Sequence, residues 1–200
     1  MTQVRRSQHM TSVAAIEKAA LELIAEQGYD SVTVEGIAAA AGISRRTFFR
    51  YFASKNDIPF GDYGALLVSL EEWLESEPDD RPMFGVIADA VMRFNRVHSD
   101  GGVAHRERMR LIMRTPSLRA NAALHQDDWV AVLTRYAARR LDASPDALVC
   151  QLVAQVSLGA ANTAYEQWLN DESSDLGELV TEAFDLVQNL SLLEISRRSR

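Results

Sequence analysis

Residues 32–55 read VTVEGIAAAAGISRRTFFRYFASK, and this stretch decides the fold. Thr33 is placed to cap a short helix over residues 34–41, and Ser44 is placed to cap a second one. Between them Gly42 permits a sharp turn, because glycine adopts a positive φ without steric strain. Two short helices joined by such a turn are typical of a helix-turn-helix, whose second helix enters the major groove of DNA.

Helical patterns continue on both sides of this motif. Apolar residues recur at three- and four-residue spacing over residues 12–27 and stop at a glycine, which predicts a longer first helix. After the motif, Ser54 with Asp57 three residues later resembles a capping box, which marks the start of a fourth helix. Pro59 is unusual inside such a helix, and we expect the helix to restart near Asp62.

The rest of the chain also has the pattern of helices, separated by short segments rich in turn-forming residues. We expect these helices over residues 62–76, 83–98, 104–114, 118–141, 145–169 and 176–196. No run of residues has the alternation typical of a strand. The predicted fold class is therefore all-α, with about nine helices in total: an N-terminal three-helix domain with a helix-turn-helix, followed by a larger helical domain.

Charge is distributed unevenly along the 200 residues. The net charge is −7, which by itself argues against binding to nucleic acid, since affinity for phosphates comes from Lys and Arg. Residues 1–58, however, hold seven basic and six acidic side chains, which leaves −8 for the remainder. Residues 44–56 hold four basic side chains and no acidic one. A small anion-binding module on an acidic body explains this asymmetry.

The sequence also argues against several other classes of protein. Cys150 is the only cysteine, so neither an intrachain disulfide nor a cysteine-based zinc site can form, and a cytoplasmic location is the natural interpretation. No stretch of eighteen apolar residues is present to span a membrane. The histidines form no metal-binding pattern, and neither a phosphate-binding glycine loop nor a nucleophile elbow is present. We therefore expect neither an enzyme nor a bound cofactor.

The order of these features resembles the DNA-binding domain of the TetR family of regulators. The resemblance covers about residues 11–58 and rests on the spacing of the glycine, the serine, the aromatic residues and the Ser–Lys pair in the motif. We accordingly divide the chain into a flexible N-terminal arm over residues 1–10, a helix-turn-helix DNA-binding domain over residues 11–58, and an effector-binding and dimerisation domain over residues 59–200.

This resemblance implies which residues contact DNA. Arginine donates two parallel hydrogen bonds to guanine and a threonine methyl suits thymine, while other polar side chains of the motif hold phosphates. The implied DNA contacts are Thr33, Ser44, Arg45, Arg46, Thr47, Tyr51 and Lys55. Phe48 and Phe52 are assigned to the small core, and Phe49 stands where many relatives carry tyrosine. A merely solvated basic face is the simpler alternative, but it does not account for the spacing of the turn and the caps.

Residues 46–63, RTFFRYFASKNDIPFGDY, are similar to a narrower subgroup, the regulators associated with the mycofactocin system. That similarity implies a long-chain acyl-CoA as the effector. The match is short, and the remaining helices resemble the family only in their number and length.

The middle helices carry large or pliable apolar side chains at helical spacing. We predict an effector pocket lined by Phe84, Met92, Met109, Met113, Trp129, Leu133, Tyr136 and Trp168. Arg106, Arg110 and Arg114 belong to a second basic cluster, which is a candidate for holding the anionic group of an effector. Both sets have a simpler interpretation, because such an apolar stripe is more often plain core and such a basic cluster is more often a solvated face.

The last two predicted helices have the pattern of an interface between two copies of the chain. Apolar residues of the final helix step by three and four, and small residues of the preceding helix permit two backbones to approach closely. The predicted dimer interface contains Leu152, Val156, Gly159, Ala160, Leu176, Val180, Ala183, Val187 and Leu190. The alternative is an ordinary core within one chain. A two-fold dimer would present two recognition helices to an inverted-repeat operator.

Together these features predict a homodimeric regulator that binds a double-stranded DNA operator and a small hydrophobic effector, without membrane association. We expect a repressor that the effector releases from its operator. An activator, or a DNA-binding protein that responds to no ligand, fits the same residues. A helical dimer scaffold without DNA binding would leave the arginines of the second motif helix unexplained.

Overall fold

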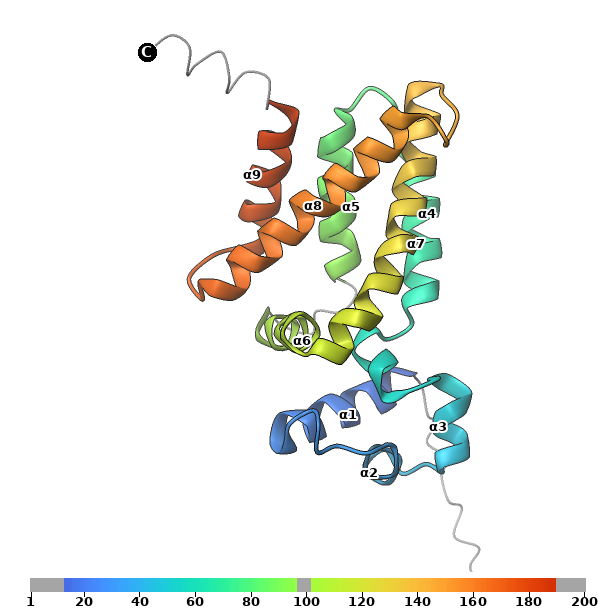
Figure 1. The fold of residues 1–200 in the computed structure, drawn as a ribbon, viewed down its shortest axis with the longest axis vertical. Coiled ribbons are helices and arrows are strands. Elements are labelled where there is room, and N and C mark those ends of the chain that lie inside the picture. The colour runs from blue at the N-terminus through green and yellow to red at the C-terminus, as the bar shows by residue number, and fades with distance from the viewer. Residues whose placement is uncertain (1–12, 97–101, 190–200) are drawn as a thin grey trace, which may run out of the picture. The chain divides into compact units, whose positions relative to one another are not determined.

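The computed structural model describes residues 13–96 and 102–189 (Figure 1). These residues form nine α-helices and one 3-10 helix and contain no strand, which confirms the all-α prediction. The chain divides after Asp62 into two compact units, whereas the sequence places a boundary after residue 58. The predicted arm over residues 1–10 lies outside the described residues.

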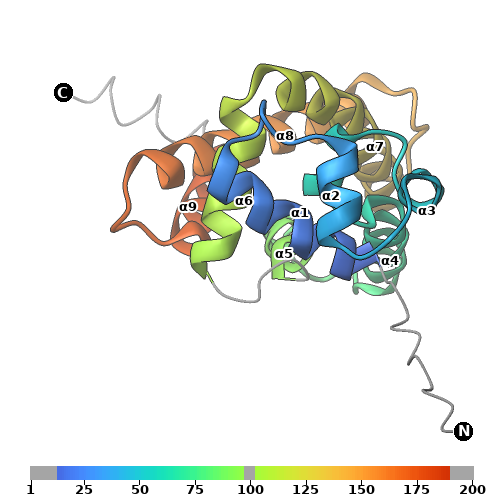
Figure 2. The ribbon, with the colours of Figure 1, turned by 90° about the horizontal axis from the view of Figure 1, so that it is seen from below.

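The first unit consists of α1 (Val13–Gln27), α2 (Val34–Ala40), α3 (Arg45–Tyr51) and the 3-10 helix η1 (Lys55–Phe60) (Figure 2). α1 packs against α2 and η1, and α2 packs against α3. Each of the four elements contributes one large, fully buried side chain, namely Ile16, Ile37, Phe48 and Ile58. Seven-residue helices are unstable alone, so burial of these side chains, at about 1.5–3 kcal/mol each, holds the unit together.

η1 takes the place of the fourth helix that the sequence predicts. Ser54 and Asp57 form the expected capping box, in which the Ser54 backbone N donates to Asp57 Oδ2 over 2.7 Å. Pro59 lies inside η1, and Gly61 ends it with a φ of 59°, a conformation that favours glycine. The α-helical conformation resumes at Tyr63, close to the restart that Pro59 predicts.

The second unit consists of α4 (Tyr63–Ser76), α5 (Met83–Arg96), α6 (Gly102–Arg114), α7 (Pro116–Leu141), α8 (Leu148–Asn170) and α9 (Leu176–Gln188). α7 begins two residues before its predicted start, because proline fits the first turn of a helix. α8 begins three residues after its predicted start. The predicted end of the last helix, at residue 196, lies outside the described residues.

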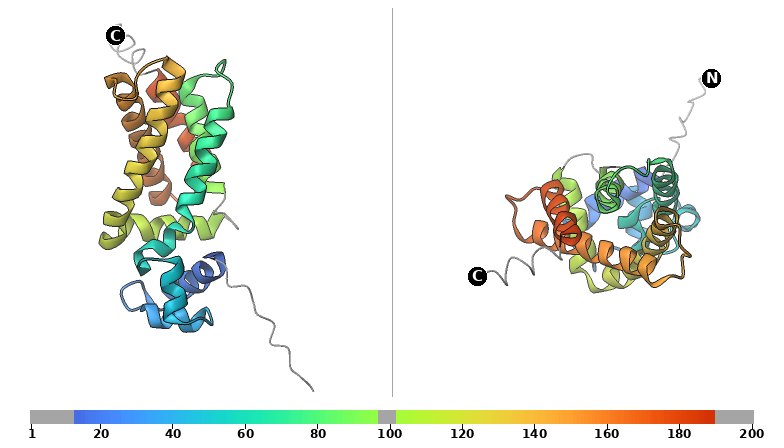
Figure 3. Two further views of the ribbon diagram at one scale, coloured as in Figure 1. Left: turned by 90° about the vertical axis from the view of Figure 1, so that its right-hand side faces the viewer. Right: turned by 90° about the horizontal axis from the view of Figure 1, so that it is seen from above.

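α8 packs against both α7 and α9 along one side of the second unit (Figure 3). Its buried face is lined largely with small side chains such as Ala154, Ala160 and Ala164, which lets the neighbouring helices pack closely. The thiol of Cys150, on the same helix, is fully buried. Within residues 13–96 and 102–189, no helix combines the length and apolar character that a membrane span requires.

Arg140 fastens the connection between α4 and α5 to the last turn of α7. Its guanidinium donates to Tyr136 Oη over 2.7 Å and to the backbone carbonyls of Asp79 and Arg81 over 3.1 and 2.7 Å. Its side chain is only 9% exposed. A buried guanidinium with several acceptors is stable only while these acceptors stay in place, so Arg140 fixes the course of this connection.

We predict that Arg140→Ala lowers the free energy of unfolding by about 1–3 kcal/mol, because it removes a largely buried side chain together with its three hydrogen bonds. The control is Arg135→Ala, which removes a half-exposed ion pair to Glu71 and should cost less than about 1 kcal/mol. All three tryptophans lie in the second unit, so urea unfolding followed by tryptophan fluorescence reports on that unit alone. Equal losses in the two variants would contradict the role of Arg140.

Candidate functional site

The turn between α2 and α3 has the geometry that the sequence predicts. Thr33 Oγ1 accepts a hydrogen bond from Gly36 N (3.1 Å), and Ser44 Oγ accepts one from Thr47 N (3.0 Å), which confirms both caps. Gly42 has a φ of 67°, and the next residue, Ile43, donates its backbone N–H to the Ala38 carbonyl over 2.9 Å. These local bonds fix the direction in which α3 leaves α2.

α3 divides its side chains between a core and an exposed face. Phe48 and Phe52 are buried with their ring centroids 5.6 Å apart, as the sequence predicts. Phe49 is 45% exposed, and its ring meets that of Phe48 edge to face at 5.3 Å. Arg45, Arg46 and Arg50 are all exposed, so one short helix presents three guanidinium groups to solvent.

These three arginines have different surroundings. Arg45 Nη1 lies 3.1 Å from Glu35 Oε1 on α2, and its guanidinium lies 5.4 Å from the centroid of the Phe49 ring. Arg50 donates to Tyr51 Oη over 3.0 Å and lies 4.8 Å from the centre of that ring. Arg46 makes no hydrogen bond or ion pair within the described part of the first unit. Arg46 is therefore the guanidinium that is most available to a ligand.

Lys55 has a structural role that the sequence does not reveal. Its Nζ donates to the backbone carbonyls of Tyr29 and Val32, each over 2.9 Å, and lies 4.4 Å from the centre of the Tyr29 ring. The family resemblance assigns Lys55 to a phosphate instead. Because two of its three donors are used inside the unit, its main effect here is to hold the α1–α2 connection against η1.

The structure separates the eight predicted pocket residues into two groups. Leu133, Tyr136 and Trp168 are buried in the core of the second unit, so for these three the simpler interpretation, packing, is the one observed. The other five are partly buried and pack against that core: Phe84, Met92, Met109, Met113 and Trp129. Of the eight, Met92 alone lines the groove described next.

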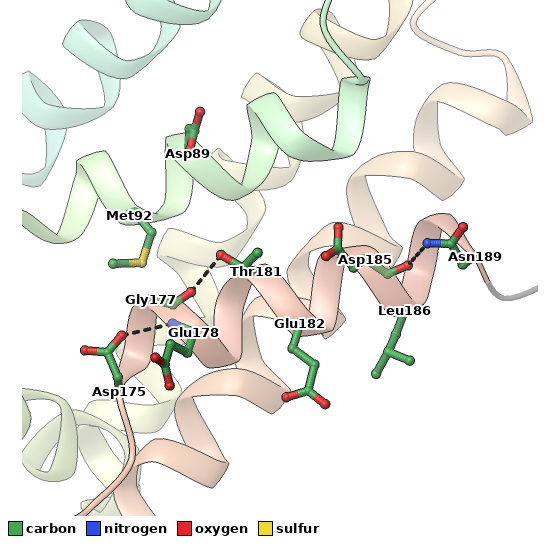
Figure 4. Close-up of a pocket in the computed structure, with 10 residues that line it drawn as sticks. All are labelled: Asp89, Met92, Asp175, Gly177, Glu178, Thr181, Glu182, Asp185, Leu186 and Asn189. Atoms are coloured by element: carbon green, nitrogen blue, oxygen red, sulfur yellow. Dashed lines mark hydrogen bonds between the residues drawn. The ribbon is translucent and has the colours of Figure 1, made fainter.

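A groove of about 760 Å³ lies between α5 and α9 (Figure 4). Five carboxylate side chains line it, together with Met92, Gly177, Thr181, Leu186 and Asn189. These acidic residues are Asp89, Asp175, Glu178, Glu182 and Asp185. Within the described chain no set of three or more potential ligands is placed to hold a metal ion. The negative charge of the groove disfavours an anionic ligand there.

Tyr63 and His125 join an aromatic cluster that the sequence did not indicate. Tyr63 Oη donates to the backbone carbonyl of His125 over 2.6 Å, and the two rings lie 4.1 Å apart. The Phe94 ring lies 5.5 Å from that of Tyr63 and 5.1 Å from that of Trp129. Burial raises the pKa of Tyr63 well above its usual range, and the nearby Asp128 carboxylate adds to the shift. The cluster joins the first turn of α4 to α7 and to the end of α5.

The arginines of α6 bind the end of α8 and the connection to α9. Arg106 donates to the backbone carbonyls of Asp171 and Ser174 over 2.9 and 3.0 Å, and its guanidinium lies 4.5 Å from the centre of the Trp168 ring. Hydrogen bonds from Ser173, aided by the charge of Arg106, lower the pKa of the Asp171 carboxyl.

The two arginines further along α6 pair with carboxylates. Arg114 lies 2.9 Å from Glu166 Oε2, and Arg110 pairs with Glu107 on its own helix and lies 3.7 Å from Glu172 Oε1. All three arginines predicted to hold an anion are thus engaged with their own chain. An anionic ligand at α6 must compete with these carboxylates.

The predicted dimer interface also divides into two groups. Leu152, Val156 and Gly159 on α8 are exposed or half-exposed, whereas Ala160, Leu176 and Val180 are buried by the chain itself. Leu176 and Val180, which the sequence places in the interface, instead pack in the core of the second unit. Ala183 and Val187 are partly buried against that core, and Leu190 lies outside the described residues.

Comparison with known protein families identifies both parts of the chain. Residues 16–58 match the family described as bacterial regulatory proteins, tetR family, and residues 81–190 match the MftR C-terminal domain. The second match covers more than half of the chain. This chain is a member of the TetR family. Its predicted membership and its predicted similarity to the mycofactocin-system regulators are both confirmed.

Individual TetR-family proteins resemble the chain over most of its length. MftR of Mycobacterium tuberculosis (strain ATCC 25618 / H37Rv), named as a mycofactocin biosynthesis transcriptional regulator, is 40% identical over 172 residues, which are 86% of this chain and 87% of MftR. Among solved structures, FadR of Bacillus subtilis in complex with stearoyl-CoA has a TM-score of 0.62 at 22% identity, over 86% of this chain and 96% of FadR. FadR of Thermus thermophilus in complex with lauroyl-CoA has a TM-score of 0.56 at 23% identity, over 88% and 93%.

TetR membership establishes the general activity. The chain is a DNA-binding transcriptional regulator with a helix-turn-helix domain and a ligand-binding domain, and it belongs to a family that is not enzymatic. In this family the DNA-binding unit recognises an operator and the larger domain takes an effector. The capped α3 with its three exposed arginines is therefore the recognition helix.

Proposed function

We propose that the protein is a homodimeric repressor that leaves an inverted-repeat operator when a long-chain acyl-CoA binds its second unit. The observation that carries the DNA-binding part is the exposed face of α3, which presents Arg45, Arg46 and Arg50 beside a rigidly capped turn. Since an operator is chromosomal, such a repressor acts in the cytoplasm.

The proposed DNA contacts separate into two kinds. Arg45, Arg46 and Thr47, in the first turn of α3, contact base edges in the major groove. Tyr51, Thr33 and Ser44 contact phosphates and set the position of α3 on the duplex. Arg50 orients the Tyr51 hydroxyl, to which it donates a hydrogen bond. Lys55 is at most a secondary contact, because the chain itself already uses two of its donors.

We predict that Arg46→Ala weakens operator binding by about 1–3 kcal/mol and relaxes the preference at one base pair, because Arg46 is exposed on α3 and has no partner in the described first unit. Lys18→Ala, on the exposed face of α1, removes the same charge and serves as the control. Gel shifts with the operator and with single-base variants measure both effects. Equal behaviour of the two variants would refute base recognition by Arg46.

The exposed face of α8 supports the homodimer. Leu148, Val149 and Leu152 are large apolar side chains left in solvent near the start of this helix, with Leu148 79% exposed and Leu152 56% exposed. Gly159, two turns further along, is exposed and leaves room for another backbone. A second copy related by a two-fold axis covers such a face and spaces the recognition helices by about 34–36 Å, one turn of DNA.

We predict that Leu152→Glu converts the dimer into a monomer and weakens operator binding, because it places a charge in the centre of the proposed interface. Leu124→Glu, at a leucine that is 66% exposed on α7, makes the same change outside that face and should leave the dimer intact. Sedimentation velocity measures the oligomeric state of both variants. A Leu152→Glu protein that sediments like the wild type would place the interface elsewhere.

Support for the acyl-CoA effector comes from relatives and from the partly buried residues. The two FadR proteins with this fold were solved with stearoyl-CoA and lauroyl-CoA. In the present chain Met109, Met113 and Trp129 are apolar and partly buried. The two methionines share α6 with the arginines, and Trp129 lies on α7, which packs against α6. Flexible methionine side chains rearrange readily around an acyl chain. The CoA phosphates would replace Glu107 and Glu172 as partners of Arg110, and Glu166 as the partner of Arg114.

Release from DNA follows if the effector prefers a conformation that fits the operator poorly. A ligand shifts such an equilibrium only by the difference between its affinities for the two states. Moving α6 breaks its bonds to the α8–α9 connection and to Trp168, so an acyl chain inserted beside α6 changes the packing of α8 and α9 directly.

We predict that a C16 acyl-CoA stabilises the protein by about 2.7 kcal/mol at a concentration 100 times its Kd and reduces operator binding at the same concentration. Thermal denaturation and gel shifts measure the two effects. Free CoA and free palmitate are the controls, since each carries only half of the ligand. Stabilisation by another class of compound alone would overturn the acyl-CoA assignment, and tighter operator binding with acyl-CoA would identify an activator or a corepressor.

A further inference from the structure

A carboxylate that a DNA-binding surface would normally exclude lies on α2, beside the first turn of the recognition helix. Glu35 projects from α2 and is exposed, with its Oε1 3.1 Å from Arg45 Nη1. A negative charge beside a polyanion lowers affinity for every duplex. Affinity for DNA alone therefore does not explain the presence of a carboxylate at position 35.

Arg45 is bounded by Glu35 on one side and by the ring of Phe49 on another. The guanidinium lies 5.4 Å from the centroid of that ring, within the range of a cation–π contact. Phe49 is itself fixed, because its ring meets the fully buried Phe48 edge to face at 5.3 Å. The guanidinium thus has two contacts within its own unit, which favour one position over others before DNA arrives.

We propose that Glu35 and Phe49 are positioning residues that make Arg45 selective for a base edge over the phosphate backbone. The inference rests on the proposed contact between Arg45 and a base. A guanidinium has five N–H donors, and Glu35 engages one of its nitrogens. The guanidinium donors can reach the neutral acceptors of guanine while the ion pair with Glu35 is kept.

Binding of Arg45 to a phosphate has a different electrostatic cost. A phosphate at the same guanidinium brings a second negative charge close to the Glu35 carboxylate, or requires that the Arg45–Glu35 pair break. Either event penalises the phosphate-bound state more than the base-bound state. Glu35 thereby weakens binding to random DNA more than binding to the operator, which is a gain in specificity.

Phe49 contributes through its ring. It supports the flat face of the Arg45 guanidinium, and its exposed edge offers an apolar surface to a thymine methyl at the neighbouring base pair. A tyrosine at this position would keep the ring, whereas a leucine would keep apolar surface but lose the cation–π contact.

The test compares binding of the full chain to its operator and to a random duplex at several salt concentrations. Glu35→Gln is expected to raise affinity for the random duplex about three- to ten-fold, with the slope of log K against log salt steeper by about 0.9, the value for one additional phosphate contact. Operator affinity should change less, so the specificity ratio, which is the affinity for the operator divided by the affinity for the random duplex, falls. Phe49→Leu should lower this ratio, and Phe49→Tyr should preserve it.

Two controls separate positioning from simple charge. Glu26→Gln makes the same charge change at the exposed end of α1, away from Arg45, and should leave the ratio unchanged. When Arg45 is replaced by alanine, Glu35→Gln should also leave the ratio unchanged. Circular dichroism melting curves verify that the variants, all at exposed positions, keep their fold.

Equal effects of Glu35→Gln and Glu26→Gln on the ratio, or an effect of Glu35→Gln that persists without Arg45, would overturn the proposal. Failure of the proposed function gives a different result, because the wild-type protein would then bind the operator and the random duplex with equal affinity.

Discussion

The seven residues of α3 must satisfy two demands at once: they must attach the helix to a small core, and they must leave a face open to DNA. Phe48 and, at the C-cap, Phe52 meet the first demand. The arginines and Thr47 meet the second. In two turns of helix no residue is left over to orient α3, so residues outside the helix must set its direction. The positive φ of Gly42 and the caps at Thr33 and Ser44 set that direction, and base recognition depends on it.

Features that depend on neighbouring residues were predictable from sequence. The caps, the Gly42 turn, the interruption at Pro59 and the order of the helices all follow from short-range chemistry. Lys55 was harder to assign, because its acceptors are backbone carbonyls 23 and 26 residues away. The residues next to Lys55 in the sequence give no information about such distant acceptors. They are equally consistent with a lysine that faces solvent or DNA. The same limit applies to Tyr63 and His125, which are 62 residues apart.

Apolar periodicity indicates that a face is buried but not which surface covers it. Leu176 and Val180 have the spacing of an interface, yet α5 and α8 cover their helix within one chain. On α8, by contrast, three large apolar residues near the beginning of the helix are left in solvent, namely Leu148, Val149 and Leu152. The predicted pocket residues divide for the same reason. Leu133, Tyr136 and Trp168 fill the core, and side-chain type alone does not distinguish filling a core from lining a cavity.

The bonds that Arg106 makes have a consequence for how this domain tolerates substitution. Arg106 donates to the main-chain carbonyls of Asp171 and Ser174, which every amino acid possesses, whereas Arg110 and Arg114 pair with side-chain carboxylates, those of Glu107, Glu172 and Glu166. Substitutions in the α8–α9 connection therefore leave the acceptors of Arg106 in place. Each ion pair of Arg110 or Arg114, by contrast, is lost when its own glutamate is replaced. The connection can thus keep its course while the charge around α6 changes.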